Sequence, residues 1–233
     1  MNGHIAIAID GPSGAGKSTL ARRCAAAFDF IYVDTGAIYR TVGLACQRAG
    51  LDRNDAEAIA ALLPSLEISM GYNDSGEQCM TLNGEDVSAA IRTPEISLYA
   101  SAVSAVPAVR AFLLEMQRKT AREHNVIMDG RDIGTVVLPN AELKIFLTAS
   151  AEERARRRMK ELQAKGLSDS FEKVLAEIQL RDEQDTNRAI APLKQAEDAV
   201  LVDTTELDFD QSFEALCRVI RERFDLQPKG AGA

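Results

Sequence analysis

The sequence has few of the residues that build structural metal centres. Among its 233 residues are two histidines and four cysteines, and no two cysteines form a CxxC pair. Zinc sites require such ligands in closely spaced clusters, so a zinc centre is not expected. The cysteines are instead expected to be small buried apolar residues with free thiols, which suits a reducing compartment.

Long apolar runs are also absent. No run reaches the roughly 18 residues that a membrane-spanning helix needs. The first ten residues, MNGHIAIAID, lack the basic segment and the cleavage site of a signal peptide. We therefore expect a cytoplasmic protein with no membrane partner.

The charge balance narrows the choice of ligand. The formal net charge is −8, which argues against a nucleic-acid partner, because such proteins normally present a basic face. Yet 19 of the 27 basic residues are arginines, and the planar guanidinium group suits phosphate oxygens. Whether the arginines bind phosphate therefore depends on where they lie in the sequence.

Five short, nearly continuous apolar runs predict buried strands, with helical patterns between them. Such runs are typical of a parallel sheet that is covered by helices on both faces. The alternation predicts an α/β fold with a doubly wound, five-stranded parallel sheet. The predicted strands are Ile5–Ile9, Phe30–Val33, Val126–Met128, Leu143–Leu147 and Ala199–Val202.

Several helix boundaries carry recognisable signals. Thr93 is a capping candidate before a proline, and Pro107 is expected to divide the following region into two helices. Ser150 and Glu153 have the spacing of a capping box. An apolar stripe predicts a final amphipathic helix, and its members are Phe213, Leu216, Cys217, Ile220 and Phe224.

The stretch from Leu66 to Val87 breaks the α/β rhythm. Ile68, Met70 and Tyr72 alternate with other residues, a turn follows at 73–76, and Cys79–Leu82 reads as a second strand. This pattern predicts a small antiparallel β insertion.

The segment Gly11–Ser18, GPSGAGKS, matches the phosphate-binding pattern G-x-x-x-x-G-K-[ST] between a predicted strand and a predicted helix. Its glycines let several backbone N–H groups point at phosphate oxygens, and the helix N-terminus adds positive potential. Lys17 is expected at the β- and γ-phosphates of ATP, and Ser18 at Mg²⁺. The residues expected to contact ATP are Gly11, Pro12, Ser13, Gly14, Ala15, Gly16, Lys17, Ser18 and Thr19.

A second magnesium-binding group is expected at a strand end. Asp34 and Asp129 each follow an apolar strand, and either could hold the water shell of the metal. Asp10 is a weaker third candidate, and the alternative for each is a polar residue that merely closes its strand.

A second signal lies between residues 171 and 188. Its members recur every three or four residues, first apolar and then charged, so that one inward helical face ends in Arg, Asp, Arg. Buried charges need partners, which a ligand with a phosphate and sugar hydroxyls would supply. The alternative is a ladder of salt bridges. The stripe is Phe171, Val174, Ile178, Arg181, Asp185 and Arg188.

The preceding helix carries Arg154, Arg157 and Arg158 on one face, with Arg156 beside them. A glycine-containing connection, 165–168, joins this helix to the next. Two arginine-bearing helices of this kind predict a lid that closes over ATP and excludes water. The alternative is a solvated basic face.

Two further loops follow predicted strands, where open α/β sheets bind ligands. They are Asp34–Arg40 and Asp129–Gly134. Arg40 and Arg131 are the natural clamps for an acceptor phosphate.

Taken together, these segments resemble the bacterial cytidylate kinase family over nearly the whole chain. The matching segments are GPSGAGKST at 11–19, DTGAIYR at 34–40, IRTPEISLYASAVSAVPAVR at 91–110, DGRDIGT at 129–135 and RDEQDTNR at 181–188. The β insertion also resembles the enlarged CMP-binding region of that family. Thr35 stands where some members have serine, which keeps the hydroxyl.

The resemblance implies transfer of phosphate from ATP to CMP or dCMP, with UMP a poorer acceptor. It implies that Ser101, Arg110 and Asp132 read cytosine with Thr35 nearby. Arg40, Arg131 and Arg188 would hold the acceptor phosphate, and Arg181 and Asp185 the sugar. Because the acceptor is already an oxyanion, no general base is needed. Catalysis would then be electrostatic, by Lys17, Arg131, Arg158 and Arg188, with Arg157 at ATP.

The expected organisation is a single kinase unit that acts as a monomer. Its core is 1–34, 91–150 and 190–226, its acceptor-binding region is 35–110 with the β insertion at 66–90, its lid is 151–189, and its tail, 227–233, is disordered.

Two other functions stay open at this point. One is a small P-loop kinase that acts on UMP or on a metabolite such as shikimate. The other is a nucleotide-driven switch, although the guanine-reading N/T-K-x-D motif is absent.

Overall fold

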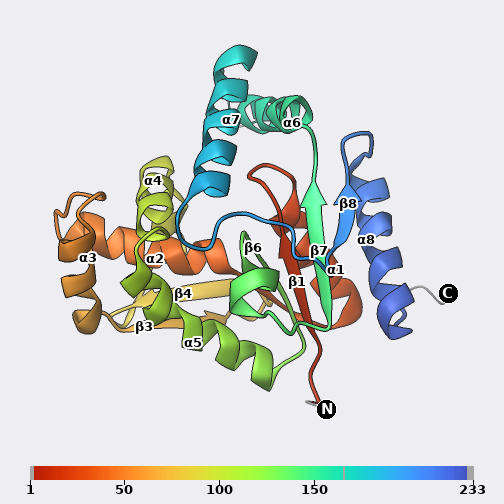
Figure 1. Ribbon diagram of the computed structural model, residues 1–233, viewed down its shortest axis with the longest axis horizontal. Helices are drawn as coiled ribbons and strands as arrows, with labels where there is room; N and C mark the ends of the chain where they lie inside the picture. The colour runs from red at the N-terminus through yellow and green to blue at the C-terminus, as the bar shows by residue number, and fades with distance from the viewer. Residues whose placement is uncertain (1–2, 165, 230–233) are drawn as a thin grey trace. The chain divides into compact units, whose positions relative to one another are not determined.

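The computed structural model describes residues 3–164 and 166–229. The chain divides into two compact units, one that ends at Tyr32 and resumes at Ala121, and a second, Val33–Thr120. The first unit contains β1 (Ala6–Asp10), α1 (Lys17–Phe28), β6 (Val126–Gly130), a π-helical turn η3 (Ile133–Val137), β7 (Leu143–Thr148), α6 (Ala151–Ala164), α7 (Phe171–Asn187), β8 (Val200–Asp203) and α8 (Phe209–Phe224) (Figure 1). The second contains α2 (Thr35–Arg48), α3 (Ala56–Leu62), η1 (Leu63–Ser65), β3 (Ile68–Tyr72), β4 (Gln78–Leu82), β5 (Glu85–Asp86), η2 (Ala90–Arg92) and α4 (Pro94–Val103). The boundaries between the units fall within β2 (Ile31–Asp34) and α5 (Pro107–Glu123).

The main sheet has the strand order β2-β6-β1-β7-β8. β1 pairs in parallel with both β6 and β7, and β7 pairs in parallel with β8. The five predicted strands and the doubly wound fold are confirmed. Each strand ends one or two residues later than predicted, because the polar residue at its end still pairs, as Asp10 does with Gly130 and Thr148 with Asp203.

The hydrophobic core of the first unit lies between the central strands and two helices. Ile7 and Ile9 of β1 pack in one cluster with residues of α1 and α8, among them Leu20 and Leu216. Figure 1 shows α8 alongside β8. The predicted apolar stripe of the last helix is confirmed, since its central members Leu216, Cys217 and Ile220 are fully buried.

A second cluster joins α6 to α7. Ala155, Val174 and Ile178 form its buried centre. The helix predicted to continue through Arg188 ends one residue earlier, because Arg188 has an extended ψ of 138°. The carbonyl of Asp185, which a further helical turn would use, accepts the N–H of Leu193 instead (2.8 Å).

The predicted β insertion is confirmed as a three-stranded antiparallel sheet of β3, β4 and β5. The side-chain amide of Gln78, the first residue of β4, bonds to both backbone groups of Asp34. Its oxygen accepts the N–H of Asp34 at 2.7 Å, and its nitrogen donates to the carbonyl at 3.2 Å. One side chain thereby ties the insertion to the start of α2.

Most of the predicted helix boundaries are also confirmed. Thr93 caps α4 by accepting the N–H of Ile96, and Pro107 opens α5. The capping box at Ser150 is only half formed. Its hydroxyl accepts the N–H of Glu153 (3.2 Å), but the Ser150 N–H donates to Thr205, and Glu153 pairs with neighbouring arginines instead.

Within the described residues, no single helix is both long and apolar enough to cross a membrane; α4 and α5 pass that test only as a pair, bent by 100°. The tail predicted to be disordered is described only as far as Lys229, whose N–H donates to the carbonyl of Ala27 at 2.7 Å. The contact of Lys229 differs from the disorder expected for the start of the tail. Residues 230–233 lie outside the described part of the chain.

Candidate active site

The loop after β1 needs its glycines for geometric reasons. Gly11, Gly14 and Gly16 all have φ between 77° and 152°, a region that side-chain-bearing residues rarely adopt. At Gly11 there is also no room, since a Cβ would lie 1.9 Å from the carbonyl oxygen of Leu147 in β7. The loop is therefore pressed against the neighbouring strand, and α1 starts directly behind it.

Lys17, the first residue of α1, is only 5% exposed. Its ammonium group donates to the carbonyl of Pro12 at 2.7 Å, so it curls back over the loop. Burial, followed by the nearby charge of Arg131, lowers the pKa of Lys17 well below its usual value, while Asp129 and Asp10 act in the opposite direction. Because burial disfavours the charged form of Lys17, an anion bound beside it would stabilise that form.

Asp129, near the end of β6, is bonded to Ser18 and Tyr32. The Ser18 hydroxyl donates to one carboxylate oxygen (2.8 Å), and the Tyr32 hydroxyl donates to the other (2.9 Å). Ser18 and Asp129 thus already share a position where a cation could sit.

Asp10, the last residue of β1, holds the start of the loop after β6. Its two oxygens accept the N–H groups of Ile133 (2.8 Å) and Gly134 (2.7 Å). Burial raises the pKa of Asp10 to about 6, although these two bonds and Lys17 favour the ionised form. Asp10 therefore acts on the loop that carries Arg131 and Asp132.

Four of the predicted acceptor-site residues form one charged cluster in the first unit. Arg131 donates to Asp185 at 2.7 Å. Arg188 lies 3.5 Å from Asp132 and 4.0 Å from Asp185, and its Nε donates to the carbonyl of Ala191. The loop after β6 and the end of α7 are thus brought together, and these side chains pair with one another.

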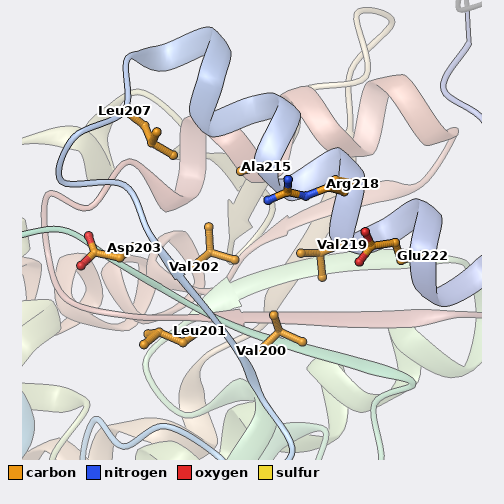
Figure 2. Close-up of a pocket in the computed structure, with 9 residues that line it drawn as sticks. All are labelled: Val200, Leu201, Val202, Asp203, Leu207, Ala215, Arg218, Val219 and Glu222. Atoms are coloured by element: carbon orange, nitrogen blue, oxygen red, sulfur yellow. The ribbon is translucent and has the colours of Figure 1, made fainter.

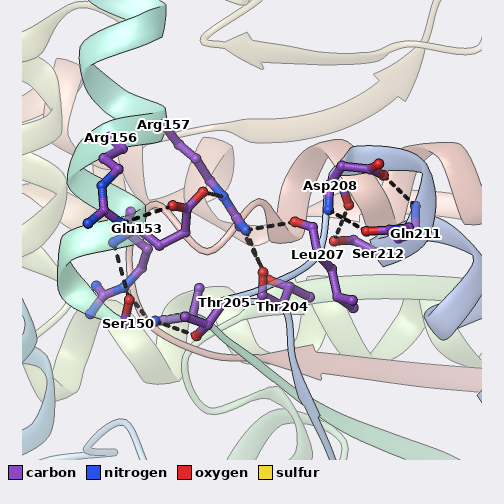
Figure 3. Close-up of polar contacts among 12 residues, drawn as sticks. Ser150, Glu153, Arg156, Arg157, Thr204, Thr205, Leu207, Asp208, Gln211 and Ser212 are labelled. Atoms are coloured by element: carbon purple, nitrogen blue, oxygen red, sulfur yellow. Dashed lines mark hydrogen bonds and ion pairs between the residues drawn. The ribbon is translucent and has the colours of Figure 1, made fainter.

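The arginines of α6 point to three different places. Arg157 donates to Glu153, to Thr204 and to the carbonyl of Leu207, and so reaches the turn after β8, as Figure 3 shows. Arg158 is about half exposed and pairs with Glu161 on its own helix. Arg154 is buried, and it contacts the phosphate loop.

Asp34, Thr35 and Arg40, three of the predicted site residues, lie in the second unit. Asp34 caps α2 through the N–H of Ala37, and its other oxygen pairs with Arg92 at 2.8 Å and lies 3.9 Å from Arg40. Both oxygens of this candidate metal ligand are therefore already occupied. Thr35, next to it, is buried.

Ser101 and Arg110 flank the break between α4 and α5. The carbonyl of Ser101 accepts the Ser104 hydroxyl, and Arg110 donates to the carbonyl of Ser104 at 3.2 Å. The guanidinium of Arg110 also lies over the ring of Tyr39, 5.6 Å from its centre. These two of the three predicted base-reading residues thus lie close to the same short turn.

A hollow of about 500 Å³ lies elsewhere in the first unit, between β8 and α8. Figure 2 shows its lining of mostly apolar side chains, with Asp203, Arg218 and Glu222 at its edge. Its lining includes none of the predicted site residues, so it is separate from the phosphate loop.

Sequence reasoning missed the positioning roles of Asp10, of Gln78 and of the Arg154–Asp182 pair. The sequence pattern places Arg154 on one helical face with other arginines but does not indicate that it is buried. A usable signal was its i, i+3 spacing from the apolar residue Ala151, which places it on the buried side of α6.

We predict that Gly11→Ala abolishes nucleotide binding by the loop. The added Cβ would meet a backbone oxygen that cannot move without shifting β7, so the loop must distort, at a cost of about 1–3 kcal/mol. Melting of the full chain with and without MgATP measures the effect, and the ATP-induced rise in melting temperature should vanish. Gly71→Ala, where nothing lies within 4 Å, is the control and should keep that rise.

The buried Asp10 predicts a distinctive pH dependence. Its pKa in the folded protein, about 6, lies above the value of 3.8 for an exposed group, so folding takes up a proton and this group loses stability as pH rises. The stability of the wild type relative to Asp10→Asn should therefore fall by about 2 kcal/mol between pH 4.5 and 7.5. Urea unfolding at both values tests this, and a difference independent of pH would contradict it.

Comparison with known proteins agrees with this geometry. The family model for cytidylate kinase matches residues 7–222. A protein named cytidylate kinase from Syntrophotalea carbinolica is 52% identical over 223 residues, which cover 96% of this chain and 94% of that protein. One of the same name from Carboxydothermus hydrogenoformans is 51% identical over 220 residues, covering 94% and 99%. Among solved structures, an uncharacterized protein from Eubacterium ventriosum shares the fold, with a TM-score of 0.53, 11% identity and coverage of 94% of this chain and 100% of that one. The chain belongs to the cytidylate kinase family.

Proposed function

We propose that this protein transfers the γ-phosphate of ATP to CMP and dCMP, forming CDP and dCDP. One observation carries the proposal beyond family membership. A phosphate loop with a buried lysine, Lys17, lies in the same unit as a second cluster of guanidinium and carboxylate groups around Arg131 and Asp185. The charge of Arg131 lowers the pKa of Lys17, so the two groups are close enough to interact. A phosphoryl transfer enzyme needs two anion sites in this relation.

The donor site is formed by 11–19. Its backbone N–H groups and the start of α1 suit the β- and γ-phosphates, and Lys17 would exchange its bond to the Pro12 carbonyl for phosphate oxygens. Arg157 lies against the turn after β8, where it would cover the far side of the nucleotide. We infer that α6 and α7, within 151–189, act as the lid.

Mg²⁺ fits the pair formed by Ser18 and Asp129. This ion is usually held by one or two protein oxygens together with substrate phosphates and water. The described residues contain no group of three or more acidic, His or Cys side chains suited to a metal, which agrees with a metal that arrives with ATP. Asp129 is favoured over Asp34, because Asp129 accepts the hydroxyl of Ser18, which follows the phosphate-loop lysine, whereas the partners of Asp34 are a helix N–H and Arg92. When bound, the ion neutralises charge on the phosphates.

The acceptor-binding region is 35–110. Arg131 and Arg188 would turn from their carboxylate partners to the acceptor phosphate, joined by Arg40. Arg181 and Asp185 would bind the sugar. In this exchange the arginines would gain the phosphate as a partner, and the released carboxylates would gain hydrogen bonds from the sugar and the base, which limits the cost.

Cytosine has a pattern of hydrogen-bonding groups that Asp132 and Arg110 can match. A carboxylate accepts from the N4 amino group, and a guanidinium donates to N3 and O2. Uracil reverses the pattern at C4 and N3, so these partners would stay unpaired, which is a strong source of discrimination. Ser101 and Thr35 would complete the base site.

Catalysis in this scheme is positioning and electrostatic stabilisation. The acceptor oxygen is already ionised, so no residue needs to remove a proton. Lys17, Arg131 and Arg188 would stabilise the transferred group from the core, and Arg158 would join on lid closure by leaving its exposed pair with Glu161. We also propose that the enzyme works as a cytoplasmic monomer, consistent with its free thiols.

The proposal predicts a clear order of acceptors. With MgATP, the protein should produce ADP rapidly with CMP and dCMP, more slowly with UMP, and not with AMP or shikimate. A coupled assay of ADP release measures each rate. Turnover with shikimate or UMP but not with CMP would overturn the proposal, and so would rapid ADP release without any acceptor.

The metal assignment predicts a contrast between two aspartates. Asp129→Asn should lower kcat by about 10- to 100-fold and raise the Mg²⁺ concentration needed for half-maximal rate. Asp34→Asn keeps a side-chain oxygen for the cap of α2 and loses the ion pair with Arg92, and it should leave the Mg²⁺ dependence unchanged. Mg²⁺ titrations at saturating ATP and CMP distinguish the two, and the reverse pattern would move the site to Asp34.

A further inference from the structure

Arg154 is the one α6 arginine whose side chain is withdrawn from solvent. It is 4% exposed, and its guanidinium makes four hydrogen bonds to three different segments. Nε donates to the carbonyl of Ala149 at 2.9 Å, just past β7. Nη1 donates to the carbonyl of Ser13 at 3.0 Å. A charged group buried in this way has a structural task, because leaving it unpaired would be costly.

The third segment is α7. Both outer nitrogens of Arg154 face the Asp182 carboxylate in a bidentate pair, at 2.9 and 2.6 Å. The Asp182 side chain is 26% exposed, so water screens this pair only partly. Bidentate pairs between arginine and carboxylate fix orientation as well as distance.

The bond to Ser13 has a direct effect on the phosphate loop. In a planar trans peptide, the carbonyl of one residue and the N–H of the next point in opposite directions. The described residues contain no cis peptide. Holding the Ser13 carbonyl toward Arg154 therefore turns the N–H of Gly14 away from Arg154.

Gly14 itself shows how closely the two elements fit. It has a φ of 77°, and a Cβ there would lie 3.5 Å from the Cβ of Arg154 and 4.0 Å from its Cδ. The stem of Arg154 thus packs on the loop at the same peptide that its guanidinium orients. Lysine could not replace it, because an ammonium group cannot serve Ala149, Ser13 and both oxygens of Asp182 from one position.

From this geometry we propose that Arg154 is a positioning residue that sets the phosphate-binding conformation of the loop, and that Asp182 holds Arg154 in place. The proposal rests on the proposed function for its assay. It concerns residues that bind no substrate, and it predicts an effect on the donor side of the reaction only.

The test compares Arg154→Lys and Asp182→Asn with two controls. Glu183→Gln makes the same chemical change as Asp182→Asn on the neighbouring, exposed residue of α7. Arg221→Lys changes an arginine of α8 that pairs with Glu214 at the surface. Steady-state kinetics give kcat and separate KM values for ATP and CMP, and melting temperatures report on the fold.

We expect both test variants to raise KM for ATP about tenfold while KM for CMP stays within twofold of the wild type. The double variant should be no worse than the poorer single one, because the two residues act as a unit. The controls should change neither KM by more than twofold.

Several outcomes would overturn the proposal. Test variants that melt earlier but keep both KM values would show that the pair only stabilises the fold. Equal rises in both KM values, or effects that simply multiply in the double variant, would also contradict it. If a test variant folds poorly, Asp182→Glu serves as a further comparison. Because it keeps the charge, its KM for ATP should lie closer to the wild-type value than that of Asp182→Asn. Failure of the proposed function is distinct, since the wild type itself would then show no CMP-dependent turnover.

Discussion

The site depends on one constraint, which is that positive charge buried beside the sheet must be paired. Arg131, Arg154 and Arg188 have side chains between 5% and 21% exposed, and each lies near a carboxylate, namely Asp185, Asp182 and Asp132 respectively. Lys17 is balanced by Asp129 and Asp10. In the proposed reaction, the pairs of Arg131 and Arg188 would open, because the acceptor phosphate would replace a carboxylate. The pair of Arg154 would stay closed, because it joins the two helices of the proposed lid and no ligand group replaces Asp182. The same electrostatic rule therefore applies to both kinds of pair.

The phosphate loop, the strands and most of the helical stripe were predictable from the sequence, because each follows from a local pattern of residues. The phosphate loop is a continuous segment whose glycines and lysine have fixed spacing, and the five strands are short apolar runs. The helical stripe from Phe171 to Asp185 follows from periodicity alone. Its last member, Arg188, left the helix because Leu193 takes the carbonyl of Asp185, a contact that no local pattern shows.

The positioning contacts could not be predicted, because they join residues far apart in the chain. Arg154 and Asp182 are 28 residues apart, Asp34 and Gln78 are 44, and Asp10 and Ile133 are 123. Each partner looks ordinary in its own segment, as a helix-surface charge, a polar strand residue or an aspartate that ends a strand. The strand order, which places β6 beside β1, brings Asp10 to the loop after β6, whereas the other two contacts depend on how helices and the second sheet pack.

The amide of Gln78 anchors the β insertion at the turn end of its hairpin. Gln78 pairs with Tyr72, directly beside the turn at 73–76, and its amide occupies both backbone groups of Asp34. The turn itself is exposed and bonds mainly to itself. A peptide epitope or a fluorescent label grafted into this turn would therefore be accessible and yet held close to the start of α2.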